Sequence, residues 1–282
     1  MNANQMTDET LITQSQGGDM DALEALVCRH QSWVYNLALR MVWRREVAED
    51  ATQEILIKAV THLGSFEGRS KFSTWLHRIA VNHLLNVRKS EMEEKAMTFT
   101  DMAESLDGIP DETLQDTHAQ PVETQLLVQE AKLGCITAML MCLDRRQRLA
   151  FILGEVFGES SETAAAALDV TSANFRQLLS RTRQDLFQFM NDKCGLVNTA
   201  NPCRCAKKAR GFMREGWLDP ANIQFSGDRI ASVQQQAAVQ LDELQDMDRQ
   251  HAELYRTQPM LRGPDLASRL RGILSRSGFE RN

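Results

Sequence analysis

The sequence predicts an all-α protein with two small helical domains, an acidic linker between them and a helical C-terminal extension. Aromatic residues make up only 6% of the 282 residues, which argues against a β-sandwich or a β-barrel. Apolar residues recur at steps of three and four in most segments, as they do on the buried face of a helix. The hydrophobic content of 43% and the charged content of 25% are those of a globular chain.

The net charge of −6 comes from one part of the chain. Residues 91–130 carry one basic and eleven acidic side chains, and this net charge of −10 exceeds that of the whole chain. The segment also contains Pro110 and Pro121 and has no sustained helical period, so it predicts an extended acidic linker. The chain then divides into a first domain, the linker, a second domain and the extension, at residues 1–90, 91–130, 131–193 and 194–282.

The first domain is expected to hold three helices. An amphipathic pattern runs from Leu23 to Met41, and a second helix is expected over Val47–Leu63, after which Gly64 provides a stop. A polar loop then leads to a third helix over Ser73–Ser90, with Ser73 as its N-cap.

The second domain is expected to end in a helix-turn-helix. Helices over Leu126–Leu140 and Asp144–Phe157 precede a short Ala-rich helix, capped by Ser160 or Ser161, and a longer helix capped by Thr171. A short helix, a tight turn and a longer basic helix fit a helix-turn-helix whose second helix enters the major groove. The alternative is an ordinary helical hairpin with a solvated basic face. The polar side chains largely away from the apolar face of the longer helix are Arg176, Gln177, Ser180, Arg181 and Arg183.

Two groups of motifs resemble a known family. Within residues 48–90, the pairs Glu49-Asp50 and Gln53-Glu54 are followed by Lys-Phe-Ser-Thr-Trp-Leu and then Arg-Ile-Ala-Val-Asn. Residues 143–183 run from Leu-Asp-Arg-Arg through the expected helix-turn-helix to Arg-Thr-Arg. With the two groups of motifs in this order, the chain resembles the bacterial extracytoplasmic-function (ECF) sigma factors of RNA polymerase over roughly residues 20–190. The resemblance implies that the chain binds core RNA polymerase, directs it to promoter DNA and promotes strand opening.

The resemblance assigns two surfaces to the first domain. Asp50, Gln53 and Glu54 share one helical face by their spacing, and this face is implied to dock on RNA polymerase. The following loop and helix are implied to capture the separated nontemplate strand of the −10 element, which needs polar groups for base edges and cations for phosphates. Phe72 and Trp75 are candidates for base stacking, although their helical spacing favours the core. The residues assigned to the −10 element are Lys71, Arg78, Asn82, Asn86, Arg88 and Lys89.

In the second domain, the resemblance assigns the five polar residues of the longer helix to the −35 element. Phe175 and Leu178 depart from the family pattern, which leaves the preferred −35 sequence open.

In the family, the linker threads through polymerase toward the RNA exit path, where we expect its acidic side chains to mimic nucleic acid. The same negative charge is expected to make the free protein bind duplex DNA poorly.

The extension contains a group of three cysteines. Cys194, Cys203 and Cys205 are three of six cysteines, which in a reducing compartment are thiols or metal ligands rather than structural disulfides. They indicate a thiolate zinc site, a thiol sensor or a packing role, and no fourth ligand is evident. No cofactor is required for the implied function. The helical pattern that follows is expected to fold back on the chain, to bind an anti-sigma factor or to pair with a second copy.

Other functional classes are not expected. No run of 18 apolar residues is present, so no membrane insertion is expected, and the first residues lack the features of a signal peptide. Both observations predict a cytoplasmic protein. Without a nucleophile–base pair, a phosphate-binding loop or a His-Glu-x-x-His motif, no enzymatic activity is expected. Two alternatives to a sigma factor stay open: a helix-turn-helix regulator of duplex DNA that acts without polymerase, and a thiol- or metal-responsive regulatory protein.

Overall fold

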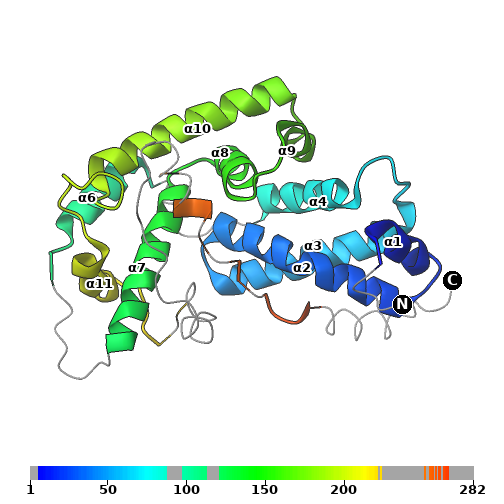
Figure 1. Ribbon diagram of the computed structural model, residues 1–282, viewed down its shortest axis with the longest axis horizontal. Helices are drawn as coiled ribbons and strands as arrows, with labels where there is room; N and C mark the ends of the chain where they lie inside the picture. The colour runs from blue at the N-terminus through cyan, green and yellow to red at the C-terminus, as the bar shows by residue number, and fades with distance from the viewer. Residues whose placement is uncertain are drawn as a thin grey trace. The chain divides into compact units, whose positions relative to one another are not determined.

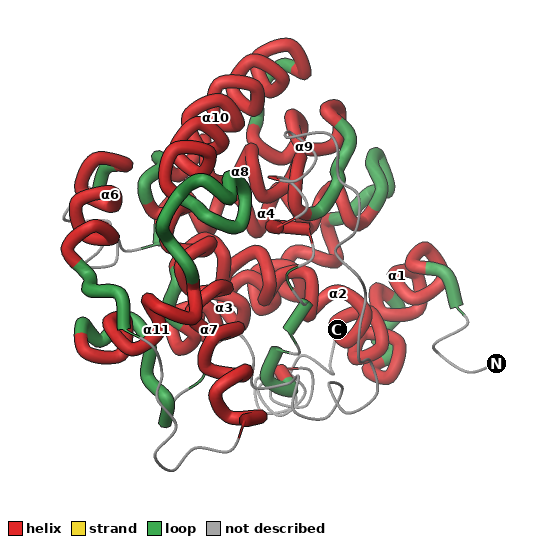
Figure 2. The backbone as a smooth tube through the Cα atoms, turned by 60° about the vertical axis from the view of Figure 1, so that its left-hand side comes forward, coloured by secondary structure: helices red, strands yellow, loops and turns green. Residues whose placement is uncertain are grey.

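The computed structural model contains helices and no strands among its described residues (Figures 1 and 2). This confirms the predicted all-α class. Within the same residues, no helix is both long and apolar enough to cross a membrane. The residues that the structure describes are 6–87, 97–112, 121–221, 223, 251, 254–256, 258, 260–261 and 263–266.

The chain divides into two compact units. The first unit combines the N-terminal helices with the short Ala-rich helix and the end of the chain, as Met1–Arg88, Ser160–Asn174 and Met260–Asn282. The second unit combines the remaining segments, Lys89–Glu159 and Phe175–Pro259. The sequence-based boundaries at residues 90, 130 and 193 stay predictions.

The first unit is built around a long helix, α2, which packs against α1, α3 and α4. The core includes Leu37, Ile55 and Leu76, each no more than 1% exposed, and burying each such side chain contributes about 2 kcal/mol. Helix α4 also packs against α3 and α9. The elements of this unit are α1 (Asp8–Gln16), α2 (Met20–Val42), α3 (Arg45–His62), the 3-10 turn η2 (Leu63–Ser65), α4 (Phe72–Asn86) and α9 (Ser161–Leu168).

The start of α4 differs from the expectation. Lys71 is the residue before the helix, and Ser73, expected as the N-cap, lies inside the first turn. The helix begins earlier because Phe72 is buried and anchors its first position. The helix ends at Asn86, since Val87 is already extended with ψ 146°. The predicted end at Ser90 lies outside the described residues.

In the described residues, the second unit consists of helices and a π-helical turn. Helix α11 packs against α7, and α8 begins with a capping box in which Asp144 and Gln147 satisfy each other's backbone N–H groups. Its elements are α6 (Phe99–Gly108), α7 (Pro121–Met141), α8 (Arg145–Phe151), the π-helical turn η3 (Ile152–Val156), α10 (Ser172–Lys193) from Phe175 onward, and α11 (Cys205–Arg214).

The prediction of an extended linker over residues 91–130 is wrong in two places, because α6 lies within it and α7 already begins at Pro121. A capping box between Thr98 and Asp101 starts α6, with the Thr98 N–H donating to Asp101 over 2.8 Å. The same bonds lower the pKa of Asp101. Met102 and Leu106 are buried. The helical pattern is short and lies among acidic residues, which concealed it in the sequence.

The acidic charge of the linker is partly neutralised within the chain. Lys193 Nζ lies 2.6 Å from Asp107, and Lys208 Nζ lies 3.1 Å from Asp111. Glu112 binds Arg214 and lies 3.6 Å from Arg210. The segment after α6 is therefore held against the basic helix α11 instead of running free.

Candidate nucleic-acid interface

The acidic face of α3 points to solvent. Asp50 and Glu54 are exposed and Gln53 is half-buried, whereas the opposite face of the helix is buried through Ala51 and Ile55. The three predicted polar residues therefore lie together on one accessible surface, as their spacing requires.

This face has a histidine neighbour that the sequence did not indicate. The Nε2 atom of His83, on α4, lies 3.9 Å from the carboxylate of Glu54. Burial and then the nearby Lys58 lower the pKa of His83, with Glu54 opposing them. The imidazole is therefore neutral at pH 7 and does not itself offset the charge of Glu54.

An aromatic cluster supports the loop before α4. The rings of Phe66, Phe72 and Trp75 have centroids 5.2 to 5.8 Å apart. Phe72 is buried, as the helical spacing favoured, while Trp75 and Phe66 are half-buried. The amide of Gln16 donates to the carbonyls of Leu63 (2.9 Å) and Phe66 (3.0 Å) and fixes the start of the loop. The sequence gave no signal for this role of Gln16.

Helix α4 presents a polar ridge on its outer face. Arg78, Asn82 and Asn86 are exposed at steps of four residues, and the amide of Asn86 donates to the Asn82 carbonyl over 2.7 Å. Lys71 is exposed at the start of the helix. The other side of α4 is buried, so the ridge sits on a rigid support. Arg88 and Lys89 lie outside the described residues.

The packing of α9 against α4 brings one predicted DNA contact into an ion pair. The Arg78 guanidinium lies 3.5 Å from the Asp169 carboxylate, and both side chains are more than half exposed. Such a pair is weak, so it leaves Arg78 available for a phosphate.

The helix-turn-helix has the predicted caps. Ser160 accepts from the Thr163 N–H at the start of α9, and Thr171 accepts from the Asn174 N–H at the start of α10. Asp169 ends α9 in the left-handed region with φ 55°, a conformation that Asp tolerates better than most residues. The turn between the two helices is therefore only a few residues long.

Helix α10 has one buried face and one exposed face. Phe175, Leu179 and Leu186 are buried. A Cβ atom at Gly154 would lie 2.7 Å from Leu179 Cδ2, so the absence of a side chain there allows α10 to pack closely on η3. Of the predicted residues, Arg176, Gln177, Ser180 and Arg181 are exposed on the outer face.

The fifth predicted residue, Arg183, is also exposed but is paired with a buried carboxylate. Its Nε–H donates to Oε1 of Glu155 over 2.7 Å. The Glu155 side chain is 4% exposed and also binds Arg256 at 3.0 Å. Arg183 thus balances a buried carboxylate, and this reason for its presence was not visible in the sequence because Glu155 is 28 positions away.

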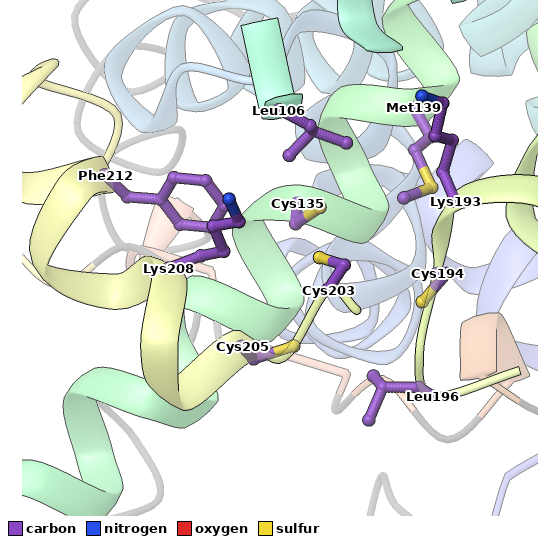
Figure 3. Close-up of a pocket in the computed structure, with 10 residues that line it drawn as sticks. All are labelled: Leu106, Cys135, Met139, Lys193, Cys194, Leu196, Cys203, Cys205, Lys208 and Phe212. Carbon is purple, nitrogen blue, oxygen red and sulfur yellow. The ribbon is translucent and has the colours of Figure 1, made fainter. Parts of the chain in front are cut away.

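The three cysteines of the extension line one pocket together with a fourth, Cys135 of α7 (Figure 3). All are free thiols. Burial raises the pKa of Cys203, and raises that of Cys205 to about 12, with neighbouring thiols adding to both shifts. The fourth cysteine is the one that the sequence did not connect with the other three.

Comparison with known protein families agrees with the two helical regions described above. The chain matches Sigma-70 region 2 over residues 26–93, which include α3 and α4, and Sigma-70, region 4 over residues 133–186, which include α9 and most of α10. Cys194, Cys203 and Cys205 lie beyond both matches.

Individual relatives indicate the same family over a longer part of the chain. The chain is 32% identical over 180 residues to the ECF RNA polymerase sigma-E factors of Escherichia coli K12 and Salmonella typhimurium LT2. It is 31% identical over 182 residues to the RNA polymerase sigma-H factor of Pseudomonas aeruginosa. Each alignment covers 64% of this chain and 92% of the relative. The chain therefore belongs to the ECF-type RNA polymerase sigma factors.

Proposed function

We propose that this chain directs core RNA polymerase to promoters through three surfaces, carried by α3, α4 and α10. The observation that carries the proposal is that each helix has an exposed polar face backed by a buried apolar one. Such a support holds polar side chains in fixed positions before the partner arrives, which reduces the entropic cost of binding.

The polymerase surface is assigned to Asp50, Gln53 and Glu54. Two carboxylates and an amide on one helical face suit a partner surface with basic side chains. The match to Sigma-70 region 2 includes these residues. Electrostatic complementarity would speed assembly with core polymerase and make it sensitive to salt.

The −10 surface is assigned to the ridge on α4. Asparagine amides provide both donors and acceptors for base edges, and Lys71 and Arg78 provide charges for phosphates. Capture of an unpaired base by this ridge favours the open promoter, because the energy of binding offsets the cost of unpairing. Strand opening in this scheme needs no catalytic group and no cofactor.

The −35 surface is assigned to Arg176, Gln177, Ser180 and Arg181 on α10. Arg and Gln are the side chains that most often read base edges in the major groove, while Ser commonly contacts phosphates. A regulator that bound duplex DNA without polymerase would account for α10 but not for the surfaces on α3 and α4. We place the protein in the cytoplasm, with an anti-sigma factor as a further candidate partner.

Footprinting of the reconstituted holoenzyme on promoter DNA tests these surfaces. Arg181→Ala is expected to weaken protection at the −35 element by about tenfold in affinity. Asn82→Ala is expected to leave that protection in place but to reduce the reactivity of unpaired bases around the −10 element. Gln184→Ala, an exposed neighbour outside the assigned set, is the matched control. Unchanged footprints for both test variants would contradict the assignments.

A further inference from the structure

The pocket shared by four cysteines lies outside the surfaces assigned to polymerase and DNA. Cys135 comes from α7, Cys194 follows directly after α10, and Cys203 and Cys205 stand at the start of α11. Figure 3 shows the four sulfur atoms around one space between these segments. The remaining lining is mostly apolar, with Leu106, Met139 and Phe212 among it, and also includes Lys193 and Lys208. Four thiols from three separate segments of the chain thus line one mostly apolar pocket.

The backbone is shaped to bring the cysteines together. A Cβ atom at Gly195 would overlap both the Cys203 carbonyl oxygen and the Arg204 guanidinium. Only glycine therefore allows the segment after Cys194 to pass so close to the segment that carries Cys203. This close approach explains the Cys-Gly pair at 194–195.

The loop between the cysteines is braced by its own side chains. The amide of Asn201 donates to the Asn191 carbonyl over 2.8 Å and to the Cys194 carbonyl over 3.3 Å. Arg204 donates to the carbonyls of Thr199 (2.9 Å) and Cys203 (2.8 Å). These bonds fix the position of Cys203 relative to Cys194 without help from regular secondary structure.

Burial and neighbouring thiols raise the pKa of Cys203 and of Cys205, and nearby cations oppose this shift only in part. Lys208 and Arg204 act electrostatically on Cys203, and Lys132 acts on Cys205, each favouring the charged form. Cys205 is also the first residue of α11, where the helix dipole favours negative charge. Burial and mutual repulsion act in the opposite direction, and a divalent cation removes the repulsion directly.

We propose that Cys135, Cys194, Cys203 and Cys205 bind one Zn²⁺ as a structural four-thiolate site. Binding forms four Zn–S bonds and releases the four thiol protons, so no oxidant or reductant takes part. Among the described residues, no three His, Cys, Asp or Glu side chains are already gathered around a single metal position. The proposal therefore requires the thiol side chains to turn about their χ1 bonds toward the shared space.

The metal would fasten the extension to the second domain. Cys135 lies inside the stretch that matches Sigma-70, region 4, and the other three ligands lie beyond it. Helix α11 in turn holds the linker through Lys208 and Arg214. Zinc would therefore fix the position of α11 and, through it, that of the linker segment after α6. This inference goes beyond the proposed function and does not depend on it.

The full-length protein, purified under reducing conditions, is the material for the test. Elemental analysis is expected to find about one zinc per chain. Replacement by Co²⁺ is expected to give the intense visible absorption of a tetrahedral thiolate site. Cys203→Ser and Cys135→Ser are each expected to lose the metal, with circular dichroism reporting whether the helices persist. Because a variant could fail to fold, metal release from the wild-type chain by a chelator provides an independent measurement.

Two other cysteines serve as matched controls. Cys28 is exposed, and the thiol of Cys142 donates to the Thr98 carbonyl at 3.6 Å. Cys28→Ser and Cys142→Ser should keep full zinc content. The proposal is overturned if wild-type protein holds no zinc and takes up no Co²⁺. It is equally overturned if iron and sulfide are found instead, or if Cys135→Ser retains zinc that Cys142→Ser loses.

Discussion

The Nε–H of Arg183 donates to Oε1 of Glu155 over 2.7 Å, and this bond ties the recognition helix α10 to the π-helical turn η3. The carboxylate is 4% exposed and has Arg256 as a second partner. A buried carboxylate needs such partners, because desolvation of an unpaired charge is costly. The π turn, in which Phe157 N–H donates to the Ile152 carbonyl, presents Glu155 toward α10.

Arg183→Ala is expected to lower the free energy of unfolding by about 2 kcal/mol, because it leaves Glu155 with one cationic partner instead of two. The measurement is denaturant unfolding followed by circular dichroism. Arg181→Ala, an exposed change two residues earlier on the same helix, should alter stability by less than about 0.5 kcal/mol. Equal effects of the two substitutions would show that the Glu155 contact does not stabilise the domain.

Lys208 and Lys207 provide a second comparison between neighbours. Lys208 is buried, binds the Ile109 carbonyl and pairs with Asp111, whereas the Lys207 side chain is 54% exposed. Lys208→Ala should therefore destabilise the chain by about 2 kcal/mol and Lys207→Ala by less than about 0.5 kcal/mol. Hydrogen exchange should also rise over residues 97–112 in Lys208→Ala alone. If exchange there stays at the wild-type level, the linker is not held by this contact.

The stability of the first unit should depend on pH through His77. Burial, followed by the charge of His30, lowers the pKa of His77 to about 4 from an ordinary value of 6.5. The folded state therefore favours the neutral ring, which stacks on Trp33 with centroids 3.7 Å apart. Stability from this residue is complete above about pH 6.5 and falls by about 3 kcal/mol as the pH decreases to 4.

Denaturant unfolding at several pH values between 4 and 7 measures this effect. His77→Phe keeps a ring against Trp33 and should flatten the pH profile, with a smaller slope left by His30 and His83, whose pKa values are also lowered by burial. His62→Gln, at an exposed position, is the control and should follow the wild-type profile. A profile that is equally steep in His77→Phe would assign the pH dependence to other groups.

Asn36 is expected to hold part of the C-terminal extension. Its amide donates to the Leu261 carbonyl over 2.7 Å, and its Oδ1 accepts from the Leu261 N–H over 2.9 Å. Asn36→Ala would leave both backbone groups without this buried partner, at a cost of about 2 kcal/mol. Faster proteolysis near residues 260–266 is the expected result, with the exposed change Glu46→Ala as control. Equal cleavage rates for the two variants would rule out the contact as an anchor.

Local patterns made much of the fold predictable. Apolar residues at helical spacing placed α2, α3, α4 and α10, and hydroxyl side chains before helices placed the caps at Ser160 and Thr171. These features depend on residues within one or two turns of each other. The exposed faces of α3 and α10 followed from the same spacing.

The missed features are contacts between distant positions. Cys135 lines one pocket with Cys203, Glu155 pairs with Arg183, and Asn36 bonds Leu261 only after the chain has folded. No local sequence pattern indicates such a pair. The prediction of an extended linker was wrong for another reason. Its acidic composition predicted an extended chain, but a capping box and two buried side chains, Met102 and Leu106, were enough to form α6.

Run-off transcription with purified core RNA polymerase and a promoter template is the most direct test that the chain acts as a sigma factor through the assigned surfaces. Full-length transcript is expected when both polymerase and the wild-type chain are present, and much less with Asn82→Ala or Arg181→Ala. The chain alone should bind the same duplex weakly. Tight, specific DNA binding by the isolated chain together with no stimulation of core polymerase would contradict the account.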